Sequence, residues 1–165
     1  MTLVNIIAAL VLFFSFIGGY TQGAVKSFFS LIVFLAAIPV AGLFYPFFAG
    51  LLSFLGDQNW ENFIGFFVTL AIASIILSFL FFLPRKWTEA IWNEGLLFRL
   101  AGGILNLLST AVGLVLLTLV ISAYPVWDWL QRALSGSEII IWLVINLPFV
   151  QEMVPEIMRM PLNPV

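Results

Sequence analysis

Long runs of apolar residues alternate with short polar segments along this chain. Four runs contain no Asp, Glu, Lys or Arg: residues 1–25, 27–56, 62–84 and 100–127. A helix needs roughly 20 apolar residues to cross the hydrocarbon core of a bilayer, and each run is long enough. The apolar positions are continuous rather than alternating every second residue, which favours helices over the strands of a membrane barrel. The pattern therefore predicts four membrane-spanning helices.

Glycine, proline and polar residues at the ends of the runs set the expected helix boundaries. We place the four helices at about residues 3–20, 28–46, 62–83 and 100–124. Pro39 and Pro46 lie within the second run, where proline removes a backbone donor and clashes with the preceding turn. Two interpretations stay open. The helix is kinked or tilted, ends near Pro46 and continues as an interfacial segment over residues 47–55, or it is broken and lines a cavity.

A short polar segment, residues 18–27, connects the first two predicted helices. It contains three glycines and Lys26, the only charged residue among the first 56. Gly19 and Gly23 have the GxxxG spacing found where membrane helices dimerise. Because this pair lies at the edge of an apolar run, with polar residues between its members, we favour a turn over a dimer interface.

The chain beyond the third run departs from the simple helix pattern. Residues 85–98 form a polar connector in which Trp87 and Trp92 predict an interfacial helix. Near the C-terminus, residues 139–150 are apolar but short for a membrane crossing, so an amphipathic or interfacial helix is favoured over a fifth span. The expected fold is an all-α integral membrane protein, with a four-helix transmembrane domain over 1–125 and an interfacial helical tail over 126–165.

Small and polar residues recur at helical spacing within the predicted spans. In the fourth helix Gly102, Asn106, Thr110 and Gly113 share a face at steps of three and four. Small residues let membrane helices approach closely, so this face predicts packing within the bundle. A pore lining is the alternative interpretation.

Composition supports a lipid environment and excludes several chemistries. The chain is 63% hydrophobic and 8% charged, with a net charge of −2, so no basic footprint for nucleic acid is present. It has no cysteine and no histidine, which removes thiol nucleophiles, Ser–His pairs and the commonest metal ligands. No ionisable residue interrupts the four runs, which argues against an ion-coupled transporter. We expect no enzyme activity, cofactor or bound metal.

Basic residues near the runs predict the orientation of the chain. Lys26 lies in the first loop, and Arg85, Lys86 and Arg99 lie in the third. The N-terminus and the second loop have no lysine or arginine. By the positive-inside rule, loops 1 and 3 are cytoplasmic and both termini are outside.

Two short segments resemble signatures of the colicin V production (CvpA) family. In the first, Gly19 and Gly23 are followed by Lys26, three positions after the last glycine. In the second, Arg99 precedes Gly102 by three positions. The length, the four predicted helices and the aromatic tail are similar to the family as well.

The chain departs from the family pattern at two places. The family usually has an aspartate near the start of the first helix, where this chain has Asn5. The family often repeats glycine every four residues after the arginine, whereas here Gly102 is followed by Asn106 and Thr110. These positions keep small or polar side chains but lose a charge.

The resemblance implies a function that composition and spacing do not show. It implies a small multi-pass protein of the bacterial inner membrane that assists production or export of a colicin V-like peptide toxin and envelope homeostasis. The family has no established catalytic residues. We expect the chain to act through protein partners in the membrane, with a homo-oligomer as the alternative. A small oligomeric channel and a structural subunit of a larger membrane complex are the alternative hypotheses.

Overall fold

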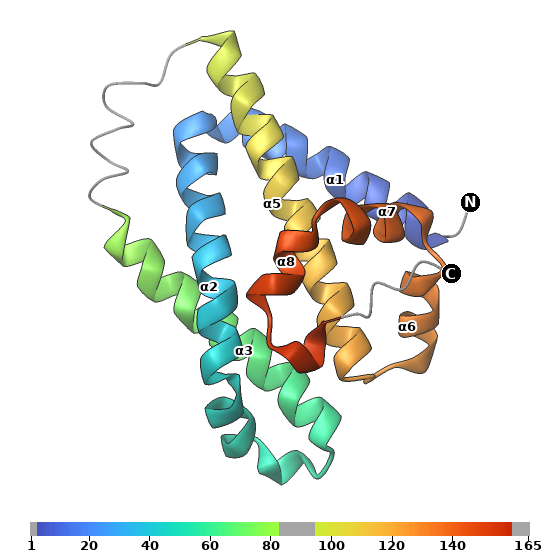
Figure 1. The fold of residues 1–165 in the computed structure, drawn as a ribbon. Helices are drawn as coiled ribbons and strands as arrows, with labels where there is room; N and C mark the ends of the chain where they lie inside the picture. Colours follow the sequence, from blue (N-terminus) through green and yellow to red (C-terminus); the bar gives the residue numbers. More distant parts are fainter. Residues whose placement is uncertain (1–2, 83–94, 160–165) are drawn as a thin grey trace.

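The computed structural model describes residues 3–82 and 95–159 and is built from helices (Figure 1). The four long helices are α1 (Leu3–Gln22), α2 (Ala24–Leu51), α3 (Gln58–Leu80) and α5 (Leu96–Ala123). Each is long and apolar enough to cross a membrane. The short elements are η1 (Ser53–Leu55), α6 (Asp128–Ser135), α7 (Glu138–Asn146), α8 (Pro148–Met153) and η2 (Glu156–Met158). The described part of the chain has no strand, so the all-α fold class is confirmed.

The four long helices pack in the order α3, α2, α5, α1. Helix α2 contacts α3 on one side and α5 on the other, and α5 in turn contacts α1. The tail lies on one side of this row, with α7 against α1 and α5, and α8 against α5 and α2. The buried residues of the tail belong to the same hydrophobic core as those of the spans. The segment after residue 125 therefore packs onto the helices rather than standing apart from them.

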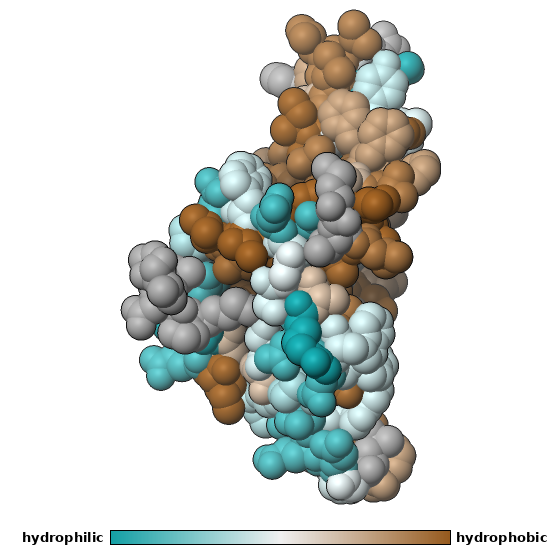
Figure 2. Space-filling view, turned by 90° about the vertical axis from the view of Figure 1, so that its right-hand side faces the viewer, coloured by the Kyte–Doolittle hydropathy of each residue, from teal (hydrophilic) through white to brown (hydrophobic). Residues whose placement is uncertain are grey.

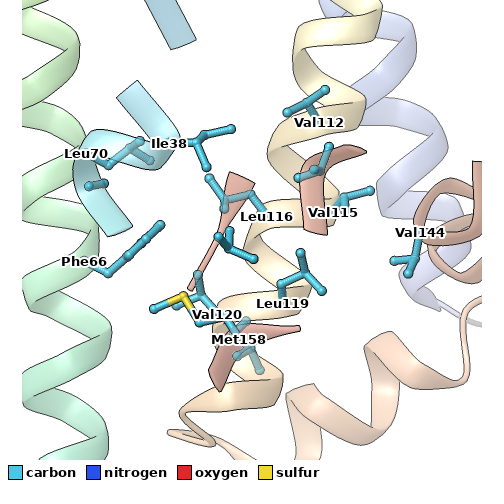
Figure 3. Close-up of a cluster of buried hydrophobic side chains, with 14 of the residues drawn as sticks. Ile38, Phe66, Leu70, Val112, Val115, Leu116, Leu119, Val120, Val144 and Met158 are labelled. Atoms are coloured by element: carbon cyan, nitrogen blue, oxygen red, sulfur yellow. The ribbon is translucent and has the colours of Figure 1, made fainter. Parts of the chain in front are cut away.

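Helix α5 is the centre of the hydrophobic core. Its buried side chains meet those of α2 and α3 on one side and those of the tail on the other (Figure 3). The residues labelled there are Ile38, Phe66, Leu70, Val112, Val115, Leu116, Leu119, Val120, Val144 and Met158. α5 thus joins the outer helices to the tail.

The outer surface of the molecule is also rich in apolar side chains. Leu3, Phe14, Leu43, Phe79 and Leu97 are among the many large hydrophobic residues that are exposed. On the face shown in Figure 2, hydrophobic surface covers most of the upper part, and hydrophilic residues gather toward the lower part and one edge. Exposure of such a surface to water is energetically unfavourable, whereas contact with lipid acyl chains is favourable.

Helix α2 is continuous through both of its prolines, which corrects the expected end near Pro46. Pro39 and Pro46 are exposed and lie inside a helix that continues to Leu51. The broken-helix interpretation is therefore wrong, and residues 47–51 are helical. Each proline removes one backbone hydrogen bond of α2, and both rings lie on its exposed side. Packing of α2 between α3 and α5 holds the helix together.

The other helix ends differ from the expected ones by a few residues. α1 extends to Gln22, α2 begins at Ala24 and α5 begins at Leu96. α3 begins at Gln58, because the Asp57 side chain accepts a hydrogen bond from the Asn59 backbone N–H at 2.9 Å and caps the helix. The expected interfacial helix with Trp87 and Trp92 lies in residues 83–94, outside the described part of the chain.

The tail does not form a fifth crossing. The apolar stretch 139–150 is divided between α7, with nine residues, and α8, with six, and Pro148 begins the second helix. Ser137 caps α7 by accepting a hydrogen bond from the Ile140 backbone N–H at 3.4 Å. The same hydroxyl donates to Oδ1 of the buried Asn5 in α1. The position where the family usually has an aspartate therefore fixes the tail to the first helix.

Two tyrosines join the end of α2 to the end of α5. The hydroxyls of Tyr45 and Tyr124 are 2.8 Å apart, and the Phe66 ring of α3 lies beside Tyr45. Tyr124 follows α5 and is only 4% exposed. Burial, with the hydrogen bond to Tyr45, raises the pKa of Tyr124. Either hydroxyl of the pair can donate to the other.

Replacing one tyrosine should destabilise the protein more than replacing both. Tyr45→Phe leaves the buried Tyr124 hydroxyl without its partner, and we expect a loss of about 1 kcal/mol in the free energy of unfolding. Adding Tyr124→Phe should recover part of that loss, because no polar group is then left unpaired. Unfolding in mixed detergent micelles, followed by circular dichroism, measures both values. Additive losses in the double variant would contradict the pairing.

Candidate functional site

Three glycines from the two signature segments meet where α1 crosses α5. A Cβ added to Gly102 would lie 2.5 Å from the Gly19 carbonyl oxygen and 2.8 Å from that of Gly23. These neighbours are backbone atoms and cannot move aside as a flexible side chain can. The two signatures, about 80 positions apart in sequence, are thus in direct backbone contact.

Gly23 is also the whole connection between α1 and α2. It has φ 84° and ψ 165°, a backbone region in which only glycine is free of strain. Its N–H donates to the Gly19 carbonyl at 3.0 Å, and its own carbonyl accepts from the Ser27 N–H at 3.2 Å. The expected polar loop over residues 18–27 is therefore a single-residue corner. The GxxxG pair contributes both to this turn and to a contact with α5 of the same chain.

Polar side chains continue the α1–α5 contact away from the corner. The Asn106 side-chain Nδ2 donates to the Ser15 carbonyl at 2.7 Å, and the Ser15 hydroxyl donates to the Asn106 carbonyl at 2.9 Å. The Ser15 and Thr110 hydroxyls are 2.5 Å apart. Polar groups in hydrocarbon need such partners, so these bonds fix the register of the two antiparallel helices.

We call the contact formed by Ser15, Gly19, Gly23, Gly102, Asn106 and Thr110 the seam. Along the chain its members are four positions apart in each of the two segments, and they pair in reverse order. Sequence reasoning identified five of the six but missed Ser15. Its spacing of four from Gly19 was the available signal, because small residues at 15, 19 and 23 lie on one face.

The remaining candidate residues lie beside the seam. A Cβ on Gly113 would make an ordinary contact of 3.7 Å with the Phe34 ring of α2, so this glycine faces α2 rather than α1. Lys26 is half-buried and Arg99 is exposed. Each is three positions from a seam glycine, so both basic residues lie at the corner end of the molecule. The structure brings together the two signatures, but not Gly113.

The hydrogen bonds of the seam should be energetically coupled. The Asn106 Nδ2 also donates to the Ser15 hydroxyl at 3.1 Å. Ser15→Ala and Asn106→Ala remove the two sides of this bond, so their losses in unfolding free energy should not add. We expect a coupling energy of about 1 kcal/mol from a double-mutant cycle. Thr118→Ala is the matched control for Asn106→Ala, because the Thr118 hydroxyl bonds only to the Leu114 carbonyl of its own helix. Its loss should add to that of Ser15→Ala, and coupling of equal size there would contradict a specific network.

The chemistry of the seam is that of helix packing. It contains hydroxyls, an amide and backbone groups, and a hydroxyl nucleophile needs a neighbouring base. The chain has no histidine, and within residues 3–82 and 95–159 no three acidic residues gather as they would around a metal ion. The seam can therefore hold two helices in one register, and its own groups supply no acid or base.

The fold and the seam define a helical protein with four potential membrane spans, in which two short signatures close the first long helix on the last. The family model described as Colicin V production protein matches residues 4–148 of this chain. The chain belongs to this family. Comparison with curated proteins found no match, and comparison with solved structures found none either.

Proposed function

We propose that this protein is a non-enzymatic component of the bacterial inner membrane that assists production or export of a colicin V-like peptide toxin and supports envelope homeostasis. The observation that carries the proposal is the family match over residues 4–148. The toxin role comes from the family description. Our proposal goes beyond that description in three respects: the inner membrane, the export step and the envelope role. The four apolar helices support a membrane location.

The use of polar groups within the long helices supports an accessory role. Among the polar side chains of α1 and α5, Ser15, Asn106 and Thr110 bond to one another, and Thr118 bonds to the Leu114 carbonyl of its own helix. Carriers that couple transport to ions keep ionisable groups within the membrane, and these two helices have none between the corner and the tail. We therefore propose that the protein acts through partners rather than by chemistry of its own.

An oligomeric channel is less well supported than the accessory role. Its sequence argument depended on a broken second helix and on the small polar face of the fourth. Helix α2 is continuous, and Gly102, Asn106 and Thr110 of that face pack against α1. A channel would therefore need a lumen between copies of the chain.

A secretion assay with matched variants tests the proposed function. In a toxin-producing strain that lacks the chain, we expect less active peptide in the medium and restoration by the wild-type gene. Gly50→Ala should restore secretion equally, because nothing lies within 4 Å of an added Cβ at that exposed position. Unchanged secretion in the deletion strain would overturn the toxin role. Ion or peptide flux through the purified protein in liposomes would overturn the accessory role in favour of a channel.

We also propose that loops 1 and 3 are cytoplasmic and both termini are outside. Lys26 is the only basic residue of the segment 18–27 that joins the first two helices, so Lys26→Glu should weaken this orientation, and Lys26→Arg should preserve it. Reporter enzymes fused to each terminus measure the effect as a mixed population of orientations. Identical reporter activities for wild type and Lys26→Glu would show that the other basic residues suffice.

A further inference from the structure

Helix α7 is apolar on both of its sides between its two end residues, Glu138 and Asn146. Ile140, Leu143 and Val144 are buried in the core, where α7 packs on α1 and α5. On the other side Ile141, Trp142 and Ile145 are 43%, 61% and 62% exposed. A helix that lies in the membrane interface has a polar face toward water, whereas the exposed polar residues of α7, Glu138 and Asn146, lie only at its two ends. Its exposed side therefore fits a hydrocarbon environment.

The level of α7 along α5 is well inside the last span. In Figure 3, Val144 points from α7 toward α5 beside Val115 and Leu119. Val115 is eight residues before Ala123, the last residue of α5, which corresponds to about 12 Å along the helix axis. Helix α7 therefore packs beside the last turns of α5 rather than beyond its end.

The break between α7 and α8 leaves few backbone groups unpaired, as hydrocarbon requires. The Leu147 N–H donates to the Leu143 carbonyl at 2.9 Å, and the Val150 N–H donates to the Leu147 carbonyl at 3.1 Å. Pro148, between them, has no N–H to satisfy. The Asn146 side chain donates to the Trp142 carbonyl at 2.8 Å. A chain break inside a bilayer is tolerated only when its polar groups are satisfied in this way.

In this region several polar side chains are buried and apolar side chains are exposed, the reverse of the arrangement in a water-soluble protein. Ser137 and Gln151 of the tail and Asn5 of α1 are buried, while the exposed side of α7 is apolar between its end residues. The adjoining α1 is exposed in the same manner at Ile6 and Leu10. The exposed side of α7 therefore continues the apolar surface of a membrane-spanning helix.

We propose that α7 and the α7–α8 break form a re-entrant segment that enters the bilayer from the side where α5 ends and returns without crossing it. Ile141, Trp142 and Ile145 contact the acyl chains of that leaflet. α6, with Asp128 and Arg132 exposed, stays at the interface, and the exposed Glu152 of α8 marks the return toward water. The proposal concerns where the tail lies and does not depend on the toxin role.

Fluorescence quenching in liposomes tests the proposal with the full-length protein. The chain has no cysteine, so Ile145→Cys and Ile141→Cys can each be labelled with bimane at a single site. The quenchers are aqueous iodide and phosphatidylcholine with a nitroxide either on the headgroup or midway along the acyl chain. Ile75→Cys on the exposed side of α3 is the membrane control, and Trp129→Cys in α6 is the interface control. Both controls replace exposed large side chains.

The three environments predict different quenching patterns. We expect the acyl-chain nitroxide to quench positions 145 and 141 nearly as well as position 75, and iodide to quench them several-fold less than position 129. Stronger quenching by iodide and the headgroup nitroxide would place α7 at the interface and overturn the proposal. Protection from all quenchers would show that protein, such as a second copy, covers this face, and would overturn it too. Only variants that elute from size-exclusion chromatography in detergent at the wild-type volume are used, because that volume indicates a folded protein. Labelling both positions 141 and 145 ensures that the conclusion does not depend on a single variant.

Discussion

Gly102→Ala should destabilise this protein by about 2 kcal/mol, although alanine favours a helix over glycine by about 1 kcal/mol. The added methyl group would lie 2.5 Å from the Gly19 carbonyl oxygen and 2.8 Å from that of Gly23. Relief requires α1 to move away from α5. The separation would then lengthen the hydrogen bonds between Ser15 and Asn106, which lie one helical turn further along the seam. Unfolding in mixed detergent micelles, followed by circular dichroism, measures the loss.

Gly50→Ala is the matched control for Gly102→Ala. Gly102 lies inside α5 and Gly50 lies in the last turn of α2, where nothing lies within 4 Å of an added Cβ. That variant should be as stable as wild type or more stable, by up to about 1 kcal/mol. Gly18→Ala provides an intermediate case, because its added Cβ would make only an ordinary 3.6 Å contact with the Asn106 side chain. Equal stability of Gly102→Ala and Gly50→Ala would contradict the close approach of α1 and α5.

Gly23→Ala should produce the second large loss, of about 2 kcal/mol, through backbone strain. At φ 84° and ψ 165° an alanine at this corner is strained whatever space surrounds it. Relaxing the corner would change the angle between α1 and α2 and draw Gly19 and Gly23 away from Gly102. Gly23→Val should be worse, because a β-branched side chain restricts the backbone further. Accumulation in the membrane and unfolding in micelles both measure the loss.

Gly56→Ala is the control for positive φ alone. Gly56, between η1 and α3, has φ 71° and ψ 5°, the left-handed region that other residues enter at moderate cost. Nothing lies within 4 Å of its added Cβ, and we expect a loss of about 1 kcal/mol. A loss at Gly23 no greater than that at Gly56 would show that the α1–α2 corner adapts to a side chain.

These two variants connect stability to the proposed function. Gly23 and Gly102 belong to the two family signatures, and each signature includes a basic residue three positions away, Lys26 and Arg99. If the only role of the signatures is to pack α1 against α5, secretion should fall in proportion to the loss of folded protein. If secretion falls while folded protein stays constant, the corner has a role with a partner as well.

Much of the fold could be predicted from local sequence. The four helices follow from uninterrupted apolar runs, because the length of such a run is a local property that the thickness of the bilayer selects. The helix ends were less predictable. Gly23 permits a one-residue corner that joins two helices without a loop, and Asp57 starts α3 four residues before the expected position. The prolines of α2 led us to predict that this helix ends near Pro46. That prediction was wrong because the effect of a proline depends on how the helix is packed.

The residues of the candidate site were largely predictable, but their pairing was not. Steps of four marked Gly102, Asn106 and Thr110 as one face of a helix, and Gly19 and Gly23 as another. Nothing in those steps indicates that the two faces meet. The contact between Asn5 and Ser137, 132 positions apart, has no local signal either.

The sequence by itself therefore determined that this is a helical membrane protein with four potential spans and two family signatures. The tertiary structure decided that the signatures form one seam, that α2 is unbroken and that the tail packs into the core beside α1 and α5. The physical reason is the solvent. Acyl chains are as apolar as the helices, so hydrophobicity selects spans but no particular pair of them. Pairing depends on close backbone approach and on a few buried hydrogen bonds, which only the folded chain brings together.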